Sequence, residues 1–370
     1  MKNDHVHVLR CVECGGSLDL RDATLQDDVV ISGRLGCQQC DRVYPVIATV
    51  AVCFRRNVLH DYLEPFERDF ILEQGWQDCL THSEGGHDPW HQKQKDVSDN
   101  WSYQWGLVAK NMDQKDFSGR GYHAPEAFWN FVRIPRESVS GKTVLVTCGG
   151  FGREAYHLVA AGAETVFFNE IGVEIYQAAK LIPDAGRKLV LLRSDAIHLP
   201  LADHSVAFAI CDHALQHIPM YTEAFRKLVA LTQSGGKTII CVYSWENNFL
   251  MTHCVDPSKK VLHKINLKVL RFLALPITAM VFLAAHGFYA PLGRFLPNLG
   301  RKLPLFEHMI FWSQFPFPVL WISIFDLLHA PVSHHFRREE VEKLALDNDL
   351  VIEELHNTNG SLWSLVGIKP

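Results

Sequence analysis

The sequence predicts an α/β protein whose main domain is a doubly wound, largely parallel sheet that ends in an antiparallel strand pair. Three observations support this fold class. Short apolar runs alternate with helix-like segments over residues 141–245, a glycine-rich turn directly follows the first run, and the chain closes with a helix and two strand-like segments. At about 150 residues per domain, a chain of 370 residues has room for two domains, or for one large domain with an appendage.

Composition and charge disfavour several classes of protein. Apolar residues make up 48% of the chain and charged residues 21%, which is typical of a folded protein and not of a disordered one. The net charge of −5 disfavours a general nucleic-acid binder, which usually needs a basic surface. The first ten residues contain no apolar run, so we expect no secretory signal and a cytoplasmic location, with membrane association as the alternative.

Shifts in composition divide the chain into five segments. They are a zinc ribbon at 1–56, an aromatic-rich linker and helical cap at 57–140, a cofactor-binding core at 141–245, an apolar helical insertion at 246–330, and a C-terminal helix with a strand pair at 331–370.

Two Cys-x-x-Cys pairs predict a structural zinc site in the first segment. Cys11 and Cys14 are separated from Cys37 and Cys40 by 22 residues, and each pair can offer two thiolates from one tight turn. Four thiolates complete the tetrahedron that structural Zn²⁺ prefers. Such a metal leaves no position open for a catalytic water, so we expect it to stabilise a segment too small for a core of its own. Unrelated or redox-active thiol pairs are the alternative.

The core segment begins with the run Thr143–Thr147, which enters the glycine-rich turn and then a helix-like stretch at 153–161. Further apolar runs follow at 165–169, 188–193, 206–211 and 238–243, with helix-like segments near 172–181 and 221–231. Parallel strands joined by helices place ligands at the carboxyl ends of the strands.

Residues at these strand ends are of the types that bind a nucleoside cofactor. Gly149, Gly150 and Gly152 let the backbone approach a ligand at a helix N-terminus, although a tight turn without a ligand is the alternative. Glu170 ends the next strand, 20 residues after Gly150, where a carboxylate can accept ribose hydroxyls. Asp195 follows the third strand, where a helix cap is the alternative.

This segment resembles the class I S-adenosylmethionine-dependent methyltransferases of the methyltransferase type 11 kind. The matching motifs are Val144-Leu-Val-Thr-Cys-Gly-Gly-Phe-Gly152, Asp203-His-Ser-Val-Ala-Phe208, Leu215-Gln-His-Ile218 and Ser234-Gly-Gly-Lys237. Val146 stands where the family usually has Asp, Cys148 where it has the first Gly, and Ala207 where it has a second Asp. The resemblance implies a Rossmann-like methyltransferase sheet that binds S-adenosylmethionine, with Glu170 on the ribose and Asp195 at the adenine. The cofactor-binding residues that we expect on this basis are Thr147, Cys148, Gly149, Gly150, Gly152, Glu170, Ile171, Asp195, Ala196 and Asp212.

Two segments before the core carry further resemblances. Residues 8–54, with Cys11-x-x-Cys14-Gly-Gly and Cys37-x-x-Cys40-x-x-x-Tyr44-Pro-Val, are similar to the small zinc-ribbon protein that partners and activates methyltransferases. The stretch Asp99-Asn-Trp-Ser-Tyr-Gln-Trp105 resembles an element that precedes the fold in some ribbon-fused methyltransferases. Its aromatic residues can close over cofactor or acceptor, and packing of both tryptophans into the core is the alternative.

Histidines after the fourth strand are the candidate catalytic residues. Methyl transfer requires mainly alignment of the acceptor with the methyl group and exclusion of water. A base is needed where the acceptor loses a proton, and imidazole suits that role at neutral pH. His217, and after it His213, are therefore the candidate bases, with a structural or solvated histidine as the alternative.

The insertion suggests an apolar acceptor. Residues 272–293 and 310–325 contain no acidic or basic side chain, but prolines interrupt the first stretch. We interpret both as lid or core helices, and contact of 272–325 with a membrane surface or a hydrophobic substrate is the alternative.

Three functions follow from these observations. Methyl transfer to a small or hydrophobic acceptor is the first. A non-catalytic scaffold is the second, because of the departures at Val146, Cys148 and Ala207. Methylation of RNA is the third, and it is disfavoured because residues 1–56 have no cluster of Lys and Arg beyond Arg55-Arg56 and the total charge is acidic.

Overall fold

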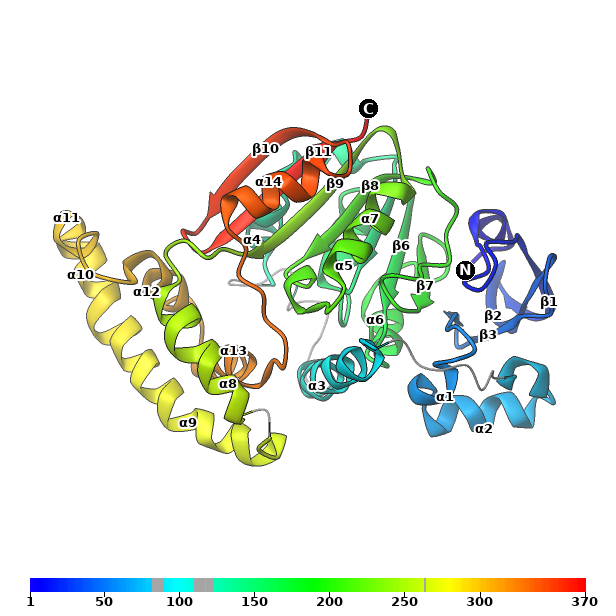
Figure 1. Cartoon of the computed structure of the whole chain (residues 1–370), viewed down its shortest axis with the longest axis horizontal. Coiled ribbons are helices and arrows are strands. Elements are labelled where there is room, and N and C mark those ends of the chain that lie inside the picture. The colour runs from blue at the N-terminus through cyan, green and yellow to red at the C-terminus, as the bar shows by residue number, and fades with distance from the viewer. Residues whose placement is uncertain (82–88, 110–116, 118–122, 263) are drawn as a thin grey trace.

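The computed structural model describes residues 1–81, 89–109, 117, 123–262 and 264–370 (Figure 1). Eleven strands of this described part form one continuous sheet in the order β1-β2-β3-β4-β7-β6-β5-β8-β9-β11-β10. The strands are β1 (Leu18–Gln26), β2 (Val29–Cys37), β3 (Val43–Ile47), β4 (Val50–Val52), β5 (Thr143–Thr147), β6 (Thr165–Glu170), β7 (Leu189–Arg193), β8 (Val206–Asp212), β9 (Thr232–Tyr243), β10 (Val351–Thr358) and β11 (Leu362–Ile368).

The predicted doubly wound sheet is confirmed. Strands β7, β6, β5, β8 and β9 pair in parallel, and the chain winds outward from β5 in both directions. The last strand, β11, runs antiparallel between β9 and β10 and forms the predicted strand pair. Because the carboxyl ends of β5 and its parallel neighbours meet at one edge, that edge is where a ligand is expected.

Helices cover both faces of this sheet. Those that precede and accompany the core are α1 (Leu59–Tyr62), α2 (Pro65–Glu73), α3 (His91–Ala109), α4 (Pro125–Val132), α5 (Arg153–Ala160), α6 (Ile175–Leu181), α7 (Tyr221–Leu231) and α14 (Arg338–Leu346). Short 3-10 helices are η1 (Asn3–Val8), η2 (Gln77–Leu80), η4 (Arg136–Val139) and η5 (Leu215–His217).

The alternation of side chains along β5 divides the interior into two cores. Leu145 belongs to the core that contains Phe225 of α7, whereas Val144 and Val146 belong to the core that contains Leu158 of α5. A central strand with helices on both faces is buried on both sides, which explains its continuous apolar run.

The N-terminal strands extend the same sheet. β1, β2, β3 and β4 form an antiparallel meander, and β4 then pairs in parallel with β7, with Val50 opposite Leu191. The first 56 residues therefore cover what would otherwise be the open β7 edge of the sheet.

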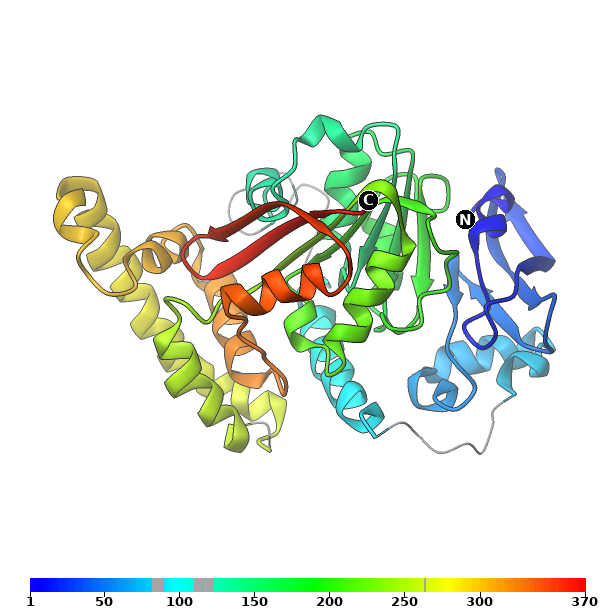
Figure 2. The same cartoon turned by 45° about the horizontal axis from the view of Figure 1, so that its top comes forward.

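The insertion forms a helical layer at the opposite end of the molecule from β1–β3, as both views show (Figures 1 and 2). It comprises the π-helix η6 (Met251–Val255), α8 (Asp256–Leu262), α9 (Leu267–Leu283), the π-helix η7 (Ala284–Tyr289), α10 (Ala290–Phe295), α11 (Pro297–Gly300), α12 (Phe306–Trp312) and α13 (Phe317–His329). Leu270 and Ala274 of α9 pack with Leu320 and Ile324 of α13 in a core of their own.

Candidate active site

A cavity of about 770 Å³ lies at the carboxyl ends of β5, β6, β8 and β9. Its floor includes the glycine-rich turn, Glu170, Asp212, His213 and Tyr243. Helices α3 and α13 contribute the opposite wall, through Trp101, Trp105, Trp321 and Asp326 among others. The predicted position of the ligand, at this edge of the sheet, thus coincides with a cavity of the size that binds small molecules.

The glycine-rich turn has a backbone that favours glycine at three positions. Cys148, Gly150 and Gly152 have φ angles of +54°, +59° and +104°, all in the left-handed region. Cys148, which replaces the usual glycine, therefore adopts a conformation that costs a residue with a side chain about 1 kcal/mol or more.

Packing inside the protein explains two of these glycines. A Cβ atom on Gly149 would lie 2.2 Å from the ring of Phe168, and one on Gly152 would lie 2.5 Å from a methyl group of Ile182. Gly150 also lines the cavity but differs in packing, because the nearest neighbour of a Cβ there would be the Trp105 ring at 3.4 Å. Of the three, Gly150 is the one at which a Cβ would meet no closer protein atom.

Glu170 is buried and lines the same cavity. Its Oε2 accepts a hydrogen bond from the Gly150 N–H at 2.7 Å, and its Oε1 accepts from the Ile171 N–H at 2.7 Å and the Gly172 N–H at 3.1 Å. Burial raises the pKa of Glu170, and the three N–H groups oppose that shift. A carboxylate offers about four acceptor positions, and three of them are used here, so Oε2 keeps one position for a ribose hydroxyl beside the Gly150 N–H.

A second buried carboxyl group lies close to Glu170. Burial, together with the charge of Glu170, raises the pKa of Glu174 to about 8, so Glu174 is largely protonated at neutral pH. A Cβ on Gly172 would come within 2.4 Å of both Glu174 oxygens, which shows how tightly this carboxyl packs on the turn. No motif pointed to Glu174, because its burial depends on the packing of α3 over α6.

Five of the predicted cofactor-binding residues are not among those that line the cavity: Thr147, Gly152, Ile171, Asp195 and Ala196. The Thr147 hydroxyl donates to Asn169 Oδ1 at 2.6 Å inside the sheet. Asp195 Oδ1 accepts from the Ile197 N–H at 3.0 Å, which is the capping geometry of the alternative interpretation. The adenine role of Asp195 stays a prediction.

Asp212 forms the centre of a buried charge network below the cavity. It accepts hydrogen bonds from the guanidinium of Arg153 and, at 2.6 Å, from Nδ1 of His213. Arg153 also donates to Glu154 Oε1 at 2.9 Å. Burial disfavours a charged ring, but the Asp212 carboxylate outweighs it and raises the pKa of His213 to about 10. His213 is therefore a cation at neutral pH and cannot accept a proton there.

His217 has the opposite character. Its Nδ1 lies 2.6 Å from the carbonyl oxygen of Val332, and because a carbonyl only accepts, Nδ1 carries the hydrogen. Nε2 then holds a lone pair, and within the described residues it has no hydrogen-bond partner. Burial lowers the pKa of His217 to about 3, so the ring is neutral at pH 7. Of the two predicted histidines, only His217 keeps an unprotonated ring nitrogen at neutral pH.

The wall opposite the sheet contains polar groups that sequence reasoning missed. Trp101 of α3 lies between two imidazoles, with ring centroids 4.7 Å from His217 and 5.2 Å from His329. His329 Nε2 lies 3.6 Å from Oδ1 of Asp326 on the next turn of α13. Burial raises the pKa of Asp326 and lowers that of His329 to about 3, so it favours the uncharged form of both side chains. The surrounding apolar run gave no sign of them.

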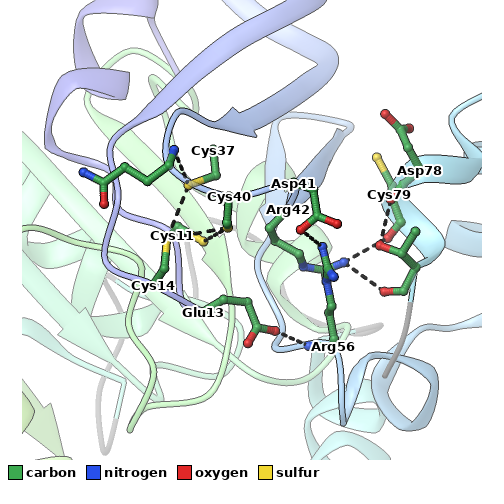
Figure 3. Close-up of polar contacts among 12 residues, drawn as sticks. Cys11, Glu13, Cys14, Cys37, Cys40, Asp41, Arg42, Arg56, Asp78 and Cys79 are labelled. Atoms are coloured by element: carbon green, nitrogen blue, oxygen red, sulfur yellow. Dashed lines mark hydrogen bonds and ion pairs between the residues drawn. The ribbon is translucent and has the colours of Figure 1, made fainter. Parts of the chain in front are cut away.

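The four predicted zinc ligands lie together (Figure 3). The sulfur of Cys14 lies 3.5 Å from those of Cys37 and Cys40, and the sulfurs of Cys11 and Cys40 are 3.7 Å apart. Zinc–sulfur bonds of about 2.3 Å in a tetrahedron place the sulfurs about 3.8 Å apart, whereas a disulfide bond is about 2 Å long. The arrangement fits a tetrahedral zinc ion.

Groups around the four thiols support the same geometry. The Tyr44 hydroxyl lies 3.0 Å from the Cys11 sulfur, and the Gln39 N–H donates to the Cys37 sulfur at 3.3 Å. A Cβ on Gly16 would lie 2.9 Å from the Cys37 sulfur, so the turn after the first pair needs glycine there. A second group of potential metal ligands consists of Asp212, His213 and Cys241. The Asp212 carboxylate of this group already forms an ion pair with Arg153.

Comparison with known proteins agrees with this geometry for the core. Residues 145–240 match the protein-family model described as "Methyltransferase domain", from β5 to β9. The chain contains a methyltransferase domain. The match covers the strands that form the cavity floor, and it confirms the predicted family resemblance for this segment; it does not extend to the N-terminal segment or the insertion.

Two curated proteins are similar to about a third of the chain. An uncharacterized methyltransferase of Mycobacterium ulcerans is 28% identical over 113 residues, which are 30% of this chain and 44% of that protein. A demethylmenaquinone methyltransferase of Thermobifida fusca is 25% identical over 121 residues, or 32% and 51% of the two chains. The chain thus spans about half the length of the relatives it matches.

Among solved structures, a similar chain is the 1,6-didemethyltoxoflavin-N1-methyltransferase of Burkholderia thailandensis, with bound S-adenosylhomocysteine. Its TM-score is 0.44 at 9% sequence identity, over 78% of this chain and 93% of that one.

Proposed function

We propose that this protein transfers a methyl group from S-adenosylmethionine to a small hydrophobic acceptor. The observation that carries the proposal is the single cavity that joins two chemically different halves. One half has the glycine-rich turn and the buried carboxylate of Glu170, and the other has the neutral imidazole of His217 under an aromatic wall. The methyltransferase domain supplies the first half.

The first half fits a nucleoside cofactor. The Gly150 N–H and the Glu170 carboxylate are the groups that would hold its ribose, and the start of α5 directs backbone N–H groups toward a carboxylate. When bound, S-adenosylmethionine supplies a methyl group on a positively charged sulfur. The buried carboxylate of Glu170, which accepts three backbone N–H groups, provides negative charge that favours such a cation.

The second half fits an acceptor that loses a proton. The Val332 carbonyl fixes the tautomer of His217, which leaves the Nε2 lone pair to take a hydrogen bond from the acceptor. As the acceptor atom forms its bond to the methyl carbon, its proton becomes strongly acidic and can pass to Nε2. Trp101 holds the ring in place from one side.

The acceptor is best described as apolar. Phe311, Phe315, Val319 and Ile322 line the wall that α12 and α13 contribute. One relative is named for the methylation of demethylmenaquinone, which agrees with an apolar acceptor. We further propose that Cys11, Cys14, Cys37 and Cys40 hold a structural zinc ion, as their sulfur spacing supports.

One observation favours a non-catalytic scaffold as the second candidate. Glu170 already accepts three backbone N–H groups, so the turn is satisfied without a ligand. Binding distinguishes the two functions, because a scaffold without a cofactor site has no reason to bind the nucleoside.

The test is calorimetry with S-adenosylmethionine and S-adenosylhomocysteine. We expect the intact protein to bind both, and Glu170→Ala to weaken binding at least about tenfold, since it removes a hydrogen bond to a charged acceptor. Glu137→Ala, at an exposed position, is the control and should bind as the intact protein does. Absence of binding by the intact protein at millimolar ligand would favour the scaffold.

A further inference from the structure

The arm formed by α9, η7 and α10 is apolar on all sides but covered on only one. Residues Leu267–Phe295 form a continuous helical stretch of 29 residues, whose most apolar window has a mean hydropathy of 1.9 and is only 17% buried. Leu270, Ala274, Thr278 and Ala285 face the body, at helical spacing, and are buried. Most of this stretch is therefore not enclosed by the described part of the chain. A helix that is apolar all round normally lies inside a protein or a membrane.

The uncovered side of the arm gathers most of the exposed large apolar residues of the described chain. Eleven of the eighteen such residues lie between 261 and 299, and Phe272, Leu283 and Phe295 are about as exposed as any of them, at 69%, 70% and 72%. The eleven are Val261, Val269, Phe272, Leu273, Ile277, Met280, Leu283, Phe288, Phe295, Leu296 and Leu299. A contiguous apolar surface of this kind marks an interaction site.

The charge of the same segment indicates what kind of partner would cover the apolar face. Residues 257–306 contain eight Lys and Arg and no Asp or Glu, although the whole chain has a net charge of −5. Exposed cations stand at both ends of the apolar face, Lys264 and Lys268 at one end, and Arg294, Arg301 and Lys302 at the other. An apolar face flanked by cations complements a lipid bilayer with anionic headgroups.

We propose that this arm face, the exposed side of residues 261–302, docks the protein on the surface of an anionic lipid bilayer. The exposed apolar side chains enter the boundary between headgroups and acyl chains, and the cations contact lipid phosphates. The arm lies in the membrane surface and does not span it, because its other side stays packed on α13. The Trp321 indole, which donates to the Arg271 carbonyl at 2.9 Å and lies 4.5 Å from the Arg271 guanidinium, fastens the two helices.

A second copy of this chain is a poorer occupant of the same face. A symmetric dimer would bring two segments together that each carry eight basic and no acidic residues. Like charges facing each other in an interface oppose association, whereas anionic lipid neutralises them.

The arm also connects with the active site. A smaller apolar cavity of about 350 Å³ lies between α9, α12 and α13, with Ile277 and Val281 of α9 in its lining. His308, Trp312 and Leu327 line both this cavity and the larger one. Docking would therefore place the larger cavity, which we propose holds the acceptor, near the lipid. An apolar acceptor dissolved in the bilayer would then have a short path from the lipid to this cavity. This consequence rests on the proposed function, but the docking itself does not.

Sedimentation with vesicles tests the docking. The probes are vesicles of phosphatidylcholine alone and of equal parts phosphatidylcholine and phosphatidylglycerol. We expect the intact protein to bind the anionic vesicles at least about tenfold more tightly than the neutral ones, and more weakly at high salt. The double variant Phe272→Asp/Leu283→Asp should lose at least about tenfold in affinity, because it places two carboxylates on the inserted face.

Three further measurements make the result specific. Leu25→Asp/Leu346→Asp changes two comparably exposed apolar residues away from the arm, at 58% and 63% exposure, and should bind vesicles as the intact protein does. Lys268→Glu/Arg301→Glu should weaken binding to anionic vesicles and leave binding to neutral ones nearly unchanged. Calorimetry with S-adenosylhomocysteine on Phe272→Asp/Leu283→Asp should match the intact protein, which separates docking from cofactor binding and shows that the variant is folded.

Three results would overturn the proposal. The first is that the intact protein does not sediment with anionic vesicles. The second is that Phe272→Asp/Leu283→Asp binds these vesicles as tightly as Leu25→Asp/Leu346→Asp does. The third is that sedimentation velocity shows a dimer of the intact protein, that Phe272→Asp/Leu283→Asp abolishes this dimer, and that neither the intact protein nor the variant binds vesicles, which would mean that the face joins two copies of the chain.

Discussion

Replacing Asp212 by Asn tests the charge network beneath the cavity. Asp212 faces two cations, Arg153 and His213, and its side chain is 1% exposed. Removing one partner of a buried pair leaves uncompensated charge and costs about 3–5 kcal/mol. Arg153 keeps one carboxylate, Glu154, but burial raises the pKa of that group, so it compensates poorly. We therefore expect a loss of about 3 kcal/mol in the free energy of unfolding at pH 7.

The pH dependence gives a second measure of the same network. The pKa of His213 is raised from about 6.5 to about 10 in the folded protein. A raised histidine pKa contributes stability that is fully present below pH 6.5 and is lost as the pH rises toward 10. Asp212→Asn removes this contribution, so the variant should show little of that loss between pH 7 and 10.

Urea unfolding and histidine NMR measure these effects. Asp203→Asn is the matched control, because Asp203 pairs with Lys227 at 3.2 Å on the exposed surface, where such a pair contributes about 0.5 kcal/mol. Proton NMR should show His213 charged up to pH 9 in the intact protein and neutral at pH 7 in Asp212→Asn. A variant within about 0.5 kcal/mol of the control, or a His213 that titrates near 6.5 in the intact protein, would refute the reasoning.

Three further predictions concern the turn, the metal and the buried acid. Gly152→Ala should lower the free energy of unfolding by about 3 kcal/mol, because its Cβ would meet Ile182 at 2.5 Å and φ is +104°; denaturation with an unchanged midpoint would contradict this. Metal analysis should find one zinc equivalent in the intact protein and in Cys254→Ser, a change at an exposed cysteine, but none in Cys37→Ser; full retention by Cys37→Ser would contradict the site. Glu174→Gln should raise stability at pH 8 by about 2 kcal/mol and change it little at pH 4.5, because the folded state holds the Glu174 proton until about pH 8 and the unfolded chain releases it near 4.5. Equal stability changes at the two pH values would show that Glu174 is not the buried acid.

Residue patterns predicted the parts of this protein that depend on local sequence. The apolar run of β5, buried on both faces, and the turn from Cys148 to Gly152 are visible because their burial and backbone demands fall on consecutive residues. The Cys-x-x-Cys pairs were equally clear, since each tight turn presents two thiols by itself. The position of Glu170 followed from the rule that parallel strands end at one edge.

Features that depend on long-range packing could not be read from the sequence. The pairing of β4 with β7 joins residues about 140 positions apart, and the residues of neither strand indicate which strand it pairs with. Asp326 and His329 lie in an apolar helix, and their burial against Trp101 depends on the placement of two helices. The opposite proton affinities of His213 and His217 depend on one carboxylate and one carbonyl group, which the chain brings in from different elements.

The ribose contact at Glu170 is the central claim of this account, and a crystal structure with S-adenosylhomocysteine tests it most directly. We predict a ribose hydroxyl within hydrogen-bond distance of the Glu170 carboxylate, at Oε2, the oxygen that also accepts the Gly150 N–H. Density for the nucleoside at another place, or a crystal soaked to saturation in which Glu170 still accepts all three N–H groups and no nucleoside is bound, would contradict the claim.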